Sequence, residues 1–201
     1  MEHIERKALL LAGLAALTLT ACQPEPSGGA GADQAARLDQ IPTRARAADG
    51  NYISWREHRI DDELLTGVAL RGSDGLVMGD LDRDGFVDIV SVHESDDVYD
   101  GAPEGHIRIA FGTEDPDRWV NVTLAEGPEA GAAEDAVIAD INGDGWLDIV
   151  AACELAHLIY FQNPGVAIRD GDWPRLMPTL TRDRGSFIRV FAADLDADGW
   201  P

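Results

Sequence analysis

Three short segments of the chain repeat one pattern of oxygen-bearing side chains. Each has Asp at its first position, Asp or Asn at its third, Asp at its fifth and Gly at its sixth, and the segments start at Asp80, Asp140 and Asp194. In the first two segments, Asp88 and Asp148 occupy the ninth position. Ca²⁺ binds six to eight oxygen atoms, and the glycine permits the sharp turn on which alternate side chains converge. The pattern therefore predicts calcium sites.

The segments resemble the calcium loop of an EF-hand over their first six positions and then depart from it. An EF-hand has a bidentate Glu at position 12, where this chain has Ser91 and Ala151. An alternative without metal is a hairpin turn rich in Asp and Asn, whose side chains bond their own backbone. Three or four carboxylates so close together would repel one another in such a turn, which favours a bound cation.

The flanking sequence predicts β-strands, because short apolar runs rich in β-branched residues end at turn residues on either side of each segment. In the first two repeats these runs are 75–79 and 135–139 before the segment, 88–92 and 148–152 directly after it, and 106–112 and 158–165 further on. A tryptophan-led run, 119–124 in the first case, supplies a fourth strand. Four short antiparallel strands per repeat are typical of a β-propeller blade. We therefore expect an all-β fold, a partial β-propeller of four-stranded antiparallel blades with calcium-binding hairpin loops.

The Asp-rich loop, the tryptophan-led strand and the Phe-Gly or Phe-x-Asn-Pro-Gly endings at 111–112 and 161–165 resemble the FG-GAP/VCBS repeat family, which includes the integrin α-subunit head. The resemblance covers residues 55–201. It implies a first ligand set of Asp80, Asp82, Asp84 and Asp88 with the Phe86 carbonyl, and a second set of Asp140, Asn142, Asp144 and Asp148 with the Trp146 carbonyl. In the third segment Asp194, Asp196 and Asp198 match, but the ninth position is missing.

The number of repeats bears on the completeness of the domain. Propellers close with four to eight blades, and stacked repeats bury a core only against their neighbours. The region 52–201 holds two complete repeats and half of a third. We therefore expect this chain to be a fragment of a longer protein, with its repeat domain truncated in the third unit.

The N-terminus predicts export. A mostly apolar stretch over 8–21 follows Arg6 and Lys7, too short to span a membrane and of the right length for a signal-peptide core, so we assign 1–21 as signal peptide. The sequence 19–22 resembles a lipoprotein lipobox, which implies lipidation of Cys22 and anchoring at the cell envelope, with outer-membrane sorting favoured. Conventional cleavage, leaving an extracellular protein, is the alternative. Residues 22–51, rich in Pro, Gly and Ala, are expected to form a flexible linker.

Charge and cysteine content exclude several classes of function. The net charge is −21, which argues against nucleic-acid partners because these need basic patches. Membrane contact is then expected through the lipid anchor only. Cys153 lies in a predicted strand and is interpreted as a buried, inert thiol.

A second group of polar residues is predicted on the opposite side of the blades from the calcium loops. The connection after each second strand emerges there, and it would gather His93, Glu94, Tyr99, Glu154 and His157 as a ligand face. Loops with carboxylates and an aromatic can bind ligands on a rigid scaffold, although a variable, solvated surface loop has the same composition.

Three classes of function remain open. The first is an exported, calcium-binding surface module that binds protein or carbohydrate, as an adhesion domain does. The second is the propeller part of an extracellular carbohydrate-active enzyme of the lyase or dehydratase type, whose catalytic residues lie mostly beyond residue 201. The third is a scaffold for another domain. The sequence contains no nucleophile elbow, zinc spacing or phosphate loop, so binding is favoured over catalysis.

Overall fold

The computed structural model describes residues 43–95, 102–155, 157–182, 184 and 186–201. The chain divides into two parts, 1–56 and 57–201. In the described portion of the first part, an isolated antiparallel bridge pairs Arg46 with Tyr52. The predicted signal peptide, Cys22 and Tyr99 lie outside the described residues.

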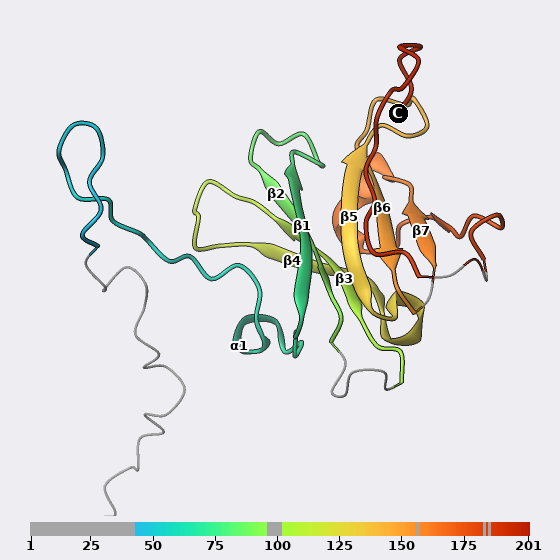
Figure 1. Ribbon diagram of the computed structural model, residues 1–201, viewed down its shortest axis with the longest axis horizontal. Coiled ribbons are helices and arrows are strands. Elements are labelled where there is room, and N and C mark those ends of the chain that lie inside the picture. Colours follow the sequence, from blue (N-terminus) through green and yellow to red (C-terminus); the bar gives the residue numbers. More distant parts are fainter. Residues whose placement is uncertain (1–42, 96–101, 156, 183, 185) are drawn as a thin grey trace, which may run out of the picture. The chain divides into compact units, whose positions relative to one another are not determined.

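The second part consists of two four-stranded antiparallel sheets, one for each complete repeat (Figure 1). A short helix, α1 (Glu63–Thr66), precedes them. Its N-cap is Asp62, whose side chain accepts a hydrogen bond from Leu65 N, and its C-cap is Gly67, which has the left-handed conformation. The first sheet contains β1 (Ser73–Gly79), β2 (Asp88–His93), β3 (His106–Phe111) and β4 (Val120–Glu126). The second contains β5 (Ala133–Ala139), β6 (Asp148–Cys153), β7 (Leu158–Phe161) and β8 (Arg175–Leu176). Two 3₁₀ helices follow β4 and β7, η2 (Gly127–Ala130) and η3 (Gly165–Asp170).

Both sheets are built in chain order and in the same register. Gly79 pairs with Asp88 in the first sheet and Ala139 pairs with Asp148 in the second, so each Asp-rich segment is the loop of a β-hairpin. Each first strand also carries a register shift near its start, between Ser73 and Gly75 and between Ala133 and Asp135. The prediction of an all-β fold of four-stranded units is confirmed.

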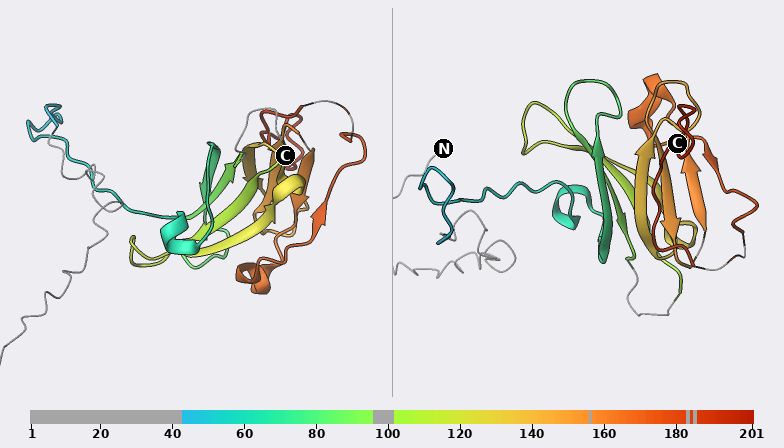
Figure 2. Two further views of the ribbon diagram at one scale, coloured as in Figure 1. Left: turned by 90° about the horizontal axis from the view of Figure 1, so that it is seen from below. Right: turned by 45° about the horizontal axis from the view of Figure 1, so that its top comes forward.

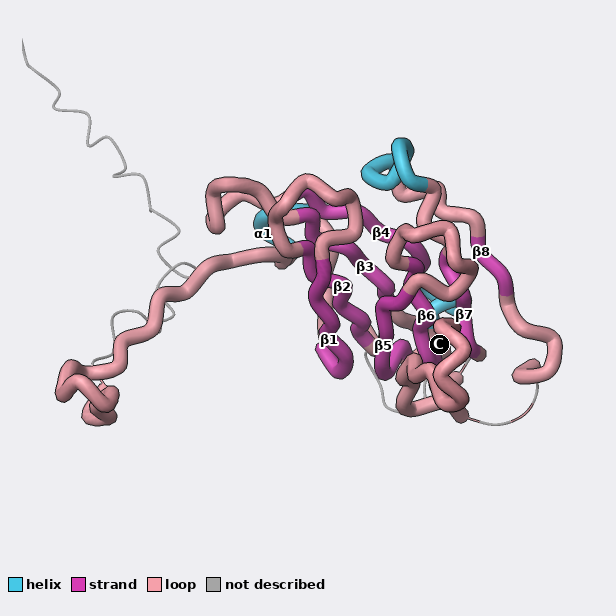
Figure 3. The backbone as a smooth tube through the Cα atoms, turned by 90° about the horizontal axis from the view of Figure 1, so that it is seen from above, coloured by secondary structure: helices cyan, strands magenta, loops and turns pink. Residues whose placement is uncertain are grey.

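The core lies between the sheets and is made by alternate residues of the strands, as a half-buried strand requires. Figures 1 to 3 show β1 beside β5, with the two sheets as adjoining layers. The fully buried side chains are mainly aliphatic and aromatic: Leu81, Val90, Val92, Ile107, Ile109, Phe111, Ile149, Ile159, Phe161 and Trp173. At Gly75 the sheets approach so closely that an added Cβ would lie 2.7 Å from Asp135 Cα, so this position admits only glycine without a shift of backbone.

The repeats differ at their edges. The fourth strand of the second sheet, β8, has only two residues, whereas β4 has seven. The segment before the third Asp-rich loop lies alongside β5. Val190 N donates to the Asp135 carboxylate, and the Arg189 side chain donates to the Glu134 carbonyl. Trp55 is not followed by a strand; residues 53–60 have no regular structure. Within the described residues, no helix has the length and apolar character needed to cross a membrane.

Candidate metal centre

The three Asp-rich loops have the same backbone conformation at two positions. The fourth position is left-handed in each, with φ of 61° at Arg83, 71° at Gly143 and 62° at Ala197. The glycine at the sixth position has φ between 90° and 94° in all three loops. A left-handed conformation is unfavourable for residues with a Cβ, so its recurrence at Arg83 and Ala197 shows that the loop imposes it.

The first and fifth side chains hold each loop in the same way. The amide of the sixth residue donates to the first carboxylate, at 3.1 Å for Asp80, 2.8 Å for Asp140 and 2.8 Å for Asp194. The amide of the seventh residue donates to the fifth carboxylate at 2.8 to 3.0 Å; these acceptors are Asp84, Asp144 and Asp198. At Asp144, this bond from the Trp146 amide and one from the Asn142 side chain lower the carboxyl pKa. The loops are therefore pre-shaped turns, and these bonds alone would also suit a turn without metal.

The ninth carboxylates connect each loop to the end of the third strand. Asp88 is fully buried and accepts bonds from Leu81 N at 2.7 Å and Gly112 N at 2.9 Å. Asp148 is also fully buried and accepts bonds from the Ile141 amide, the Asn163 amide and the Tyr160 hydroxyl.

Burial makes these carboxylates harder to ionise. Desolvation raises the pKa of Asp88 to about 6, and the nearby Asp82 and Asp84 charges add to the rise, although the two amide bonds oppose it. Desolvation also raises the pKa of Asp148. Tyr160, desolvated and bonded to Asp148, has its pKa raised to about 12 and remains a hydroxyl donor. A buried carboxylate of this kind is stabilised by a nearby cation.

The oxygen atoms converge as a hard cation requires. Asp80, Asp82 and Asp88 each offer an oxygen, and these atoms lie within 4.8 Å of one another; Asp194, Asp196 and Asp198 do the same. In the second loop, Asp140 Oδ1 is a buried acceptor with no hydrogen-bond partner among the described residues. Since a buried polar atom without a partner is costly, an orphaned carboxylate oxygen fits a cation ligand. The donor set is all oxygen, which suits Ca²⁺ rather than a softer metal.

Arg169 forms ion pairs with the first Asp-rich loop, a contact that the sequence pattern did not indicate. The Arg169 guanidinium, from η3, bonds Asp82 Oδ2 and Asp84 Oδ2 at 2.5 to 2.9 Å. Its own pKa is raised by these carboxylates against the opposing effect of desolvation. Arg169 therefore offsets part of the charge of the first loop from outside it, on the Asp82 and Asp84 side.

The predicted ligand face is brought together only in part. Glu94 and Glu154 lie with Glu134, each offering an oxygen within 4.8 Å of the others. His93 is buried, bonds Ser91 Oγ, and has its pKa lowered mainly by desolvation. Among the described residues, the histidines His93 and His157 are not part of this cluster of three glutamates.

The sequence prediction of the ligand face did not include Glu134, although the spacing of the repeats indicates an acid at this position. It stands six residues before Asp140, as Asp74 stands six residues before Asp80, so aligning the first strands identifies an acid at this position in both repeats. Desolvation, followed by repulsion from Asp74, Glu94 and Glu154, raises the Glu134 pKa to about 7.

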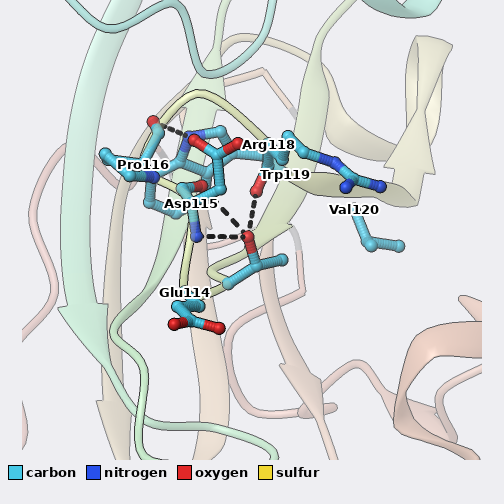
Figure 4. Close-up of a pocket in the computed structure, with 7 residues that line it drawn as sticks. Glu114, Asp115, Pro116, Arg118, Trp119 and Val120 are labelled. Carbon is cyan, nitrogen blue, oxygen red and sulfur yellow. Dashed lines mark hydrogen bonds between the residues drawn. The ribbon is translucent and has the colours of Figure 1, made fainter.

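The two tryptophans that precede the fourth strands, Trp119 and Trp173, lie in different environments. Trp173 is buried and donates through Nε1 to Ile168 O, while Trp119 is half-buried and donates to Pro116 O. Trp119 borders an open hollow of about 640 Å³, formed mainly by the 113–118 loop between β3 and β4. Figure 4 shows the residues that line it. A second hollow of about 510 Å³ shares Arg118, Trp119 and Val120 with it. The hollows border the 113–120 connection, at the same sheet end as the Asp-rich loop.

Cys153 is fully buried, and desolvation raises the pKa of its thiol to about 12. A thiol with so high a pKa carries almost no thiolate near neutrality, which disfavours a role as a nucleophile. The prediction that Cys153 is a buried residue of a strand is confirmed.

Comparison with known proteins agrees with the repeat geometry. The family model described as an FG-GAP-like repeat matches residues 80–151, which run from the start of the first loop into β6. No match was found among curated proteins or among solved structures.

Proposed function

From the FG-GAP-like repeat that residues 80–151 carry, we propose that this chain is an exported, calcium-binding repeat module that acts in surface binding or adhesion. Its partner is a protein or a carbohydrate, and its Asp-rich loops hold the calcium ions. The observation that supports calcium most directly is the convergence of Asp80, Asp82 and Asp88 oxygens in a loop whose backbone is repeated twice more.

Calcium would be held by the side chains at the first, third, fifth and ninth positions with the carbonyl at the seventh. The full set is Asp80, Asp82, Asp84, Phe86 and Asp88, then Asp140, Asn142, Asp144, Trp146 and Asp148, then Asp194, Asp196 and Asp198. Bound calcium would supply positive charge that offsets the repulsion among these clustered carboxylates. Its structural role follows from the ninth residue, because Asp88 also joins the loop to Gly112 at the end of β3.

Thermal unfolding with calcium, magnesium and chelator tests the metal. A ligand that binds only the folded state stabilises it by about 2.7 kcal/mol at 100 times its Kd, so several sites predict a rise of many degrees with calcium. Asp80→Asn and Asp140→Asn should each reduce the rise. Glu114→Gln, which changes an exposed acid outside the pattern, is the matched control and should keep it. Equal melting temperatures with calcium and with chelator would exclude the calcium proposal.

The hollow at Trp119 is the site at which we propose that the partner binds. It combines an aromatic ring, the exposed Arg118 and the exposed Asp115, groups able to bind the apolar face and the hydroxyls of a sugar or the side chains of a protein. Retention of polysaccharides and surface proteins by immobilised wild type and Trp119→Ala tests this. Binding that is equal in the two would exclude the Trp119 hollow, and release of shortened or unsaturated sugar products would favour the enzyme alternative.

Export and anchoring complete the proposal. The apolar 8–21 stretch and the Cys22 position support a lipoprotein-type signal, with the repeats carried outside the cell on the 22–51 linker. Incorporation of labelled fatty acid into wild type and not into Cys22→Ser would identify the lipidated residue. Cleavage without incorporation would instead favour the conventional signal peptide.

A further inference from the structure

Successive Asp-rich loops contact each other through the same two positions. The fourth positions are Arg83, Gly143 and Ala197, and the seventh positions are Phe86, Trp146 and Trp200. The Arg83 guanidinium lies over the Trp146 ring, 4.2 Å from its centroid, and also donates to the Gly145 carbonyl. The seventh residue of the second loop therefore covers the fourth residue of the first.

The third loop repeats this contact on the second. The Trp200 ring lies against Gly143, where an added Cβ would be 2.2 Å from Trp200 Cη2 and 2.5 Å from Cζ3. Glycine suits this position because of its left-handed φ of 71°, and the ring above it leaves no room for a Cβ. Because the same pair of positions meets at both junctions, the contact belongs to the stacking of the repeats.

The position that makes this contact is also a predicted calcium ligand. The seventh residue is expected to coordinate through its backbone carbonyl, while its amide is already bonded to the fifth carboxylate, as Trp146 N is to Asp144 at 2.8 Å. An ion in the second loop would therefore fix the Trp146 backbone and, with it, the ring on which Arg83 packs. Arg83 in turn lies between Asp82 and Asp84, the third and fifth ligands of the first loop.

We infer that the calcium sites of successive repeats are energetically coupled through the contact between the seventh residue of one loop and the fourth residue of the loop before it. This inference rests on the proposed calcium function. Calcium binding that orders the second loop also fixes the Trp146 ring on which Arg83 packs. The first loop then has less conformational freedom left to lose when it binds its own ion. The effect is reciprocal, because a coupling free energy between two sites acts equally on both.

The inference assigns Arg83 as a positioning residue for the first site, although its side chain is not a ligand. Arginine suits this role because its planar guanidinium can stack on an indole ring and donate hydrogen bonds at once. Lysine at this position would keep the charge and lose the planar stacking, so Arg83→Lys separates the two contributions.

The test is a calcium titration by calorimetry on the full chain. The second site is removed by Asp140→Asn with Asp144→Asn, in wild type and in the Arg83→Ala background, and the affinity of the first site is measured in each. Coupling predicts that removing the second site weakens the first by at least about fivefold in wild type, the lower end of measured couplings. In the Arg83→Ala background the same removal should change it less than about twofold.

Controls separate this inference from the calcium proposal and from misfolding. Arg182→Ala, at an exposed arginine outside the loops and outside the Trp119 hollow, should preserve the fivefold effect, and Arg83→Lys should give an intermediate value. Circular dichroism at the titration temperature checks that each variant keeps its strands. Calcium binding with a first-site affinity that ignores the second site in wild type would overturn the coupling, as would an undiminished effect in Arg83→Ala. Absence of all calcium binding would instead overturn the proposed function.

Discussion

Replacing Glu134 by Gln should stabilise the protein at alkaline pH and have little effect at acidic pH. Glu134 is 9% exposed and lies with Asp74, Glu94 and Glu154, while its oxygen is 3.8 Å from the Arg189 guanidinium, which is largely exposed. Its pKa is raised from 4.5 to about 7, so the folded state holds the proton more tightly than the unfolded state does. The free energy of unfolding must then fall as the pH rises from about 4.5 to about 7.

The size of the effect follows from the shift. One pKa unit corresponds to 1.36 kcal/mol, so the rise to about 7 gives a loss of at most about 3 kcal/mol by pH 8. Glutamine has the same shape, carries no charge and can donate to the Glu94 carboxylate. Glu134→Gln should therefore exceed wild type by up to about 3 kcal/mol at pH 8 and equal it within about 1 kcal/mol at pH 4.5.

Urea unfolding of both proteins at several pH values, at one fixed calcium concentration, measures this difference. Effects common to both, including any change in calcium affinity with pH, cancel in the comparison. Glu114→Gln is the matched control, because Glu114 is exposed, and its difference from wild type should stay flat with pH. If Glu134→Gln were less stable than wild type at pH 8, the Arg189 contact would outweigh the clustered charges, and the reasoning would be refuted.

Four further outcomes are expected. Asp88→Ala leaves two buried amides without an acceptor and should lower the free energy of unfolding by about 2–6 kcal/mol in urea with chelator, whereas Asp88→Asn, which keeps one acceptor, should lower it by about half as much. Arg108→Met leaves the buried Asp61 carboxylate unpaired and should cost about 3–5 kcal/mol in the same assay, with partial recovery when Asp61→Asn is added. Gly75→Ala should cost about 1–3 kcal/mol through overpacking; an unchanged stability would show that the sheets can separate there. Cys153 should react with a thiol reagent only as fast as the protein unfolds, and rapid labelling of native protein would contradict its burial.

The strands and loops could be predicted from the sequence because both depend on local spacing. The Asp-Gly pattern fixes where each hairpin turns, and the apolar runs fix which residues pair, so Asp88 and Asp148 stand at the start of their strands as expected. The fourth strand was predictable in the first repeat. In the second, β8 follows Trp173 as the tryptophan-led pattern predicts, but the spacing does not explain why it is only two residues long or why η3 precedes it.

The contacts between repeats could not be predicted in this way. Arg169 reaches Asp82 from 87 residues away, and this depends on how the two sheets pack rather than on any spacing along the chain. His93 and Glu94 were predicted to share one ligand face. In the structure, His93 is the last residue of β2, is buried and bonds Ser91, whereas Glu94 follows the strand and joins the carboxylate cluster.

Stacking of repeats explains why like charges gather at both ends of these blades. When β1 lies beside β5, equivalent positions become neighbours, so an acid that recurs in each repeat meets its own copy. Glu94 and Glu154 are such a pair, as are Asp74 and Glu134, and their repulsion adds to the desolvation that raises the Glu134 pKa. In the third repeat this pattern is broken, since Ile188 replaces the acid and Arg189 follows it, next to Glu134. The loops differ in this respect, because each copy keeps the carboxylates at its first and fifth positions, although Asn142 replaces the third carboxylate in the second loop. A proton and an arginine can offset the charge at one end. At the loop end Arg169 contacts the carboxylates of the first loop and Arg83 lies beside the second, and the calcium that we propose there would offset the carboxylate charge that these two arginines leave.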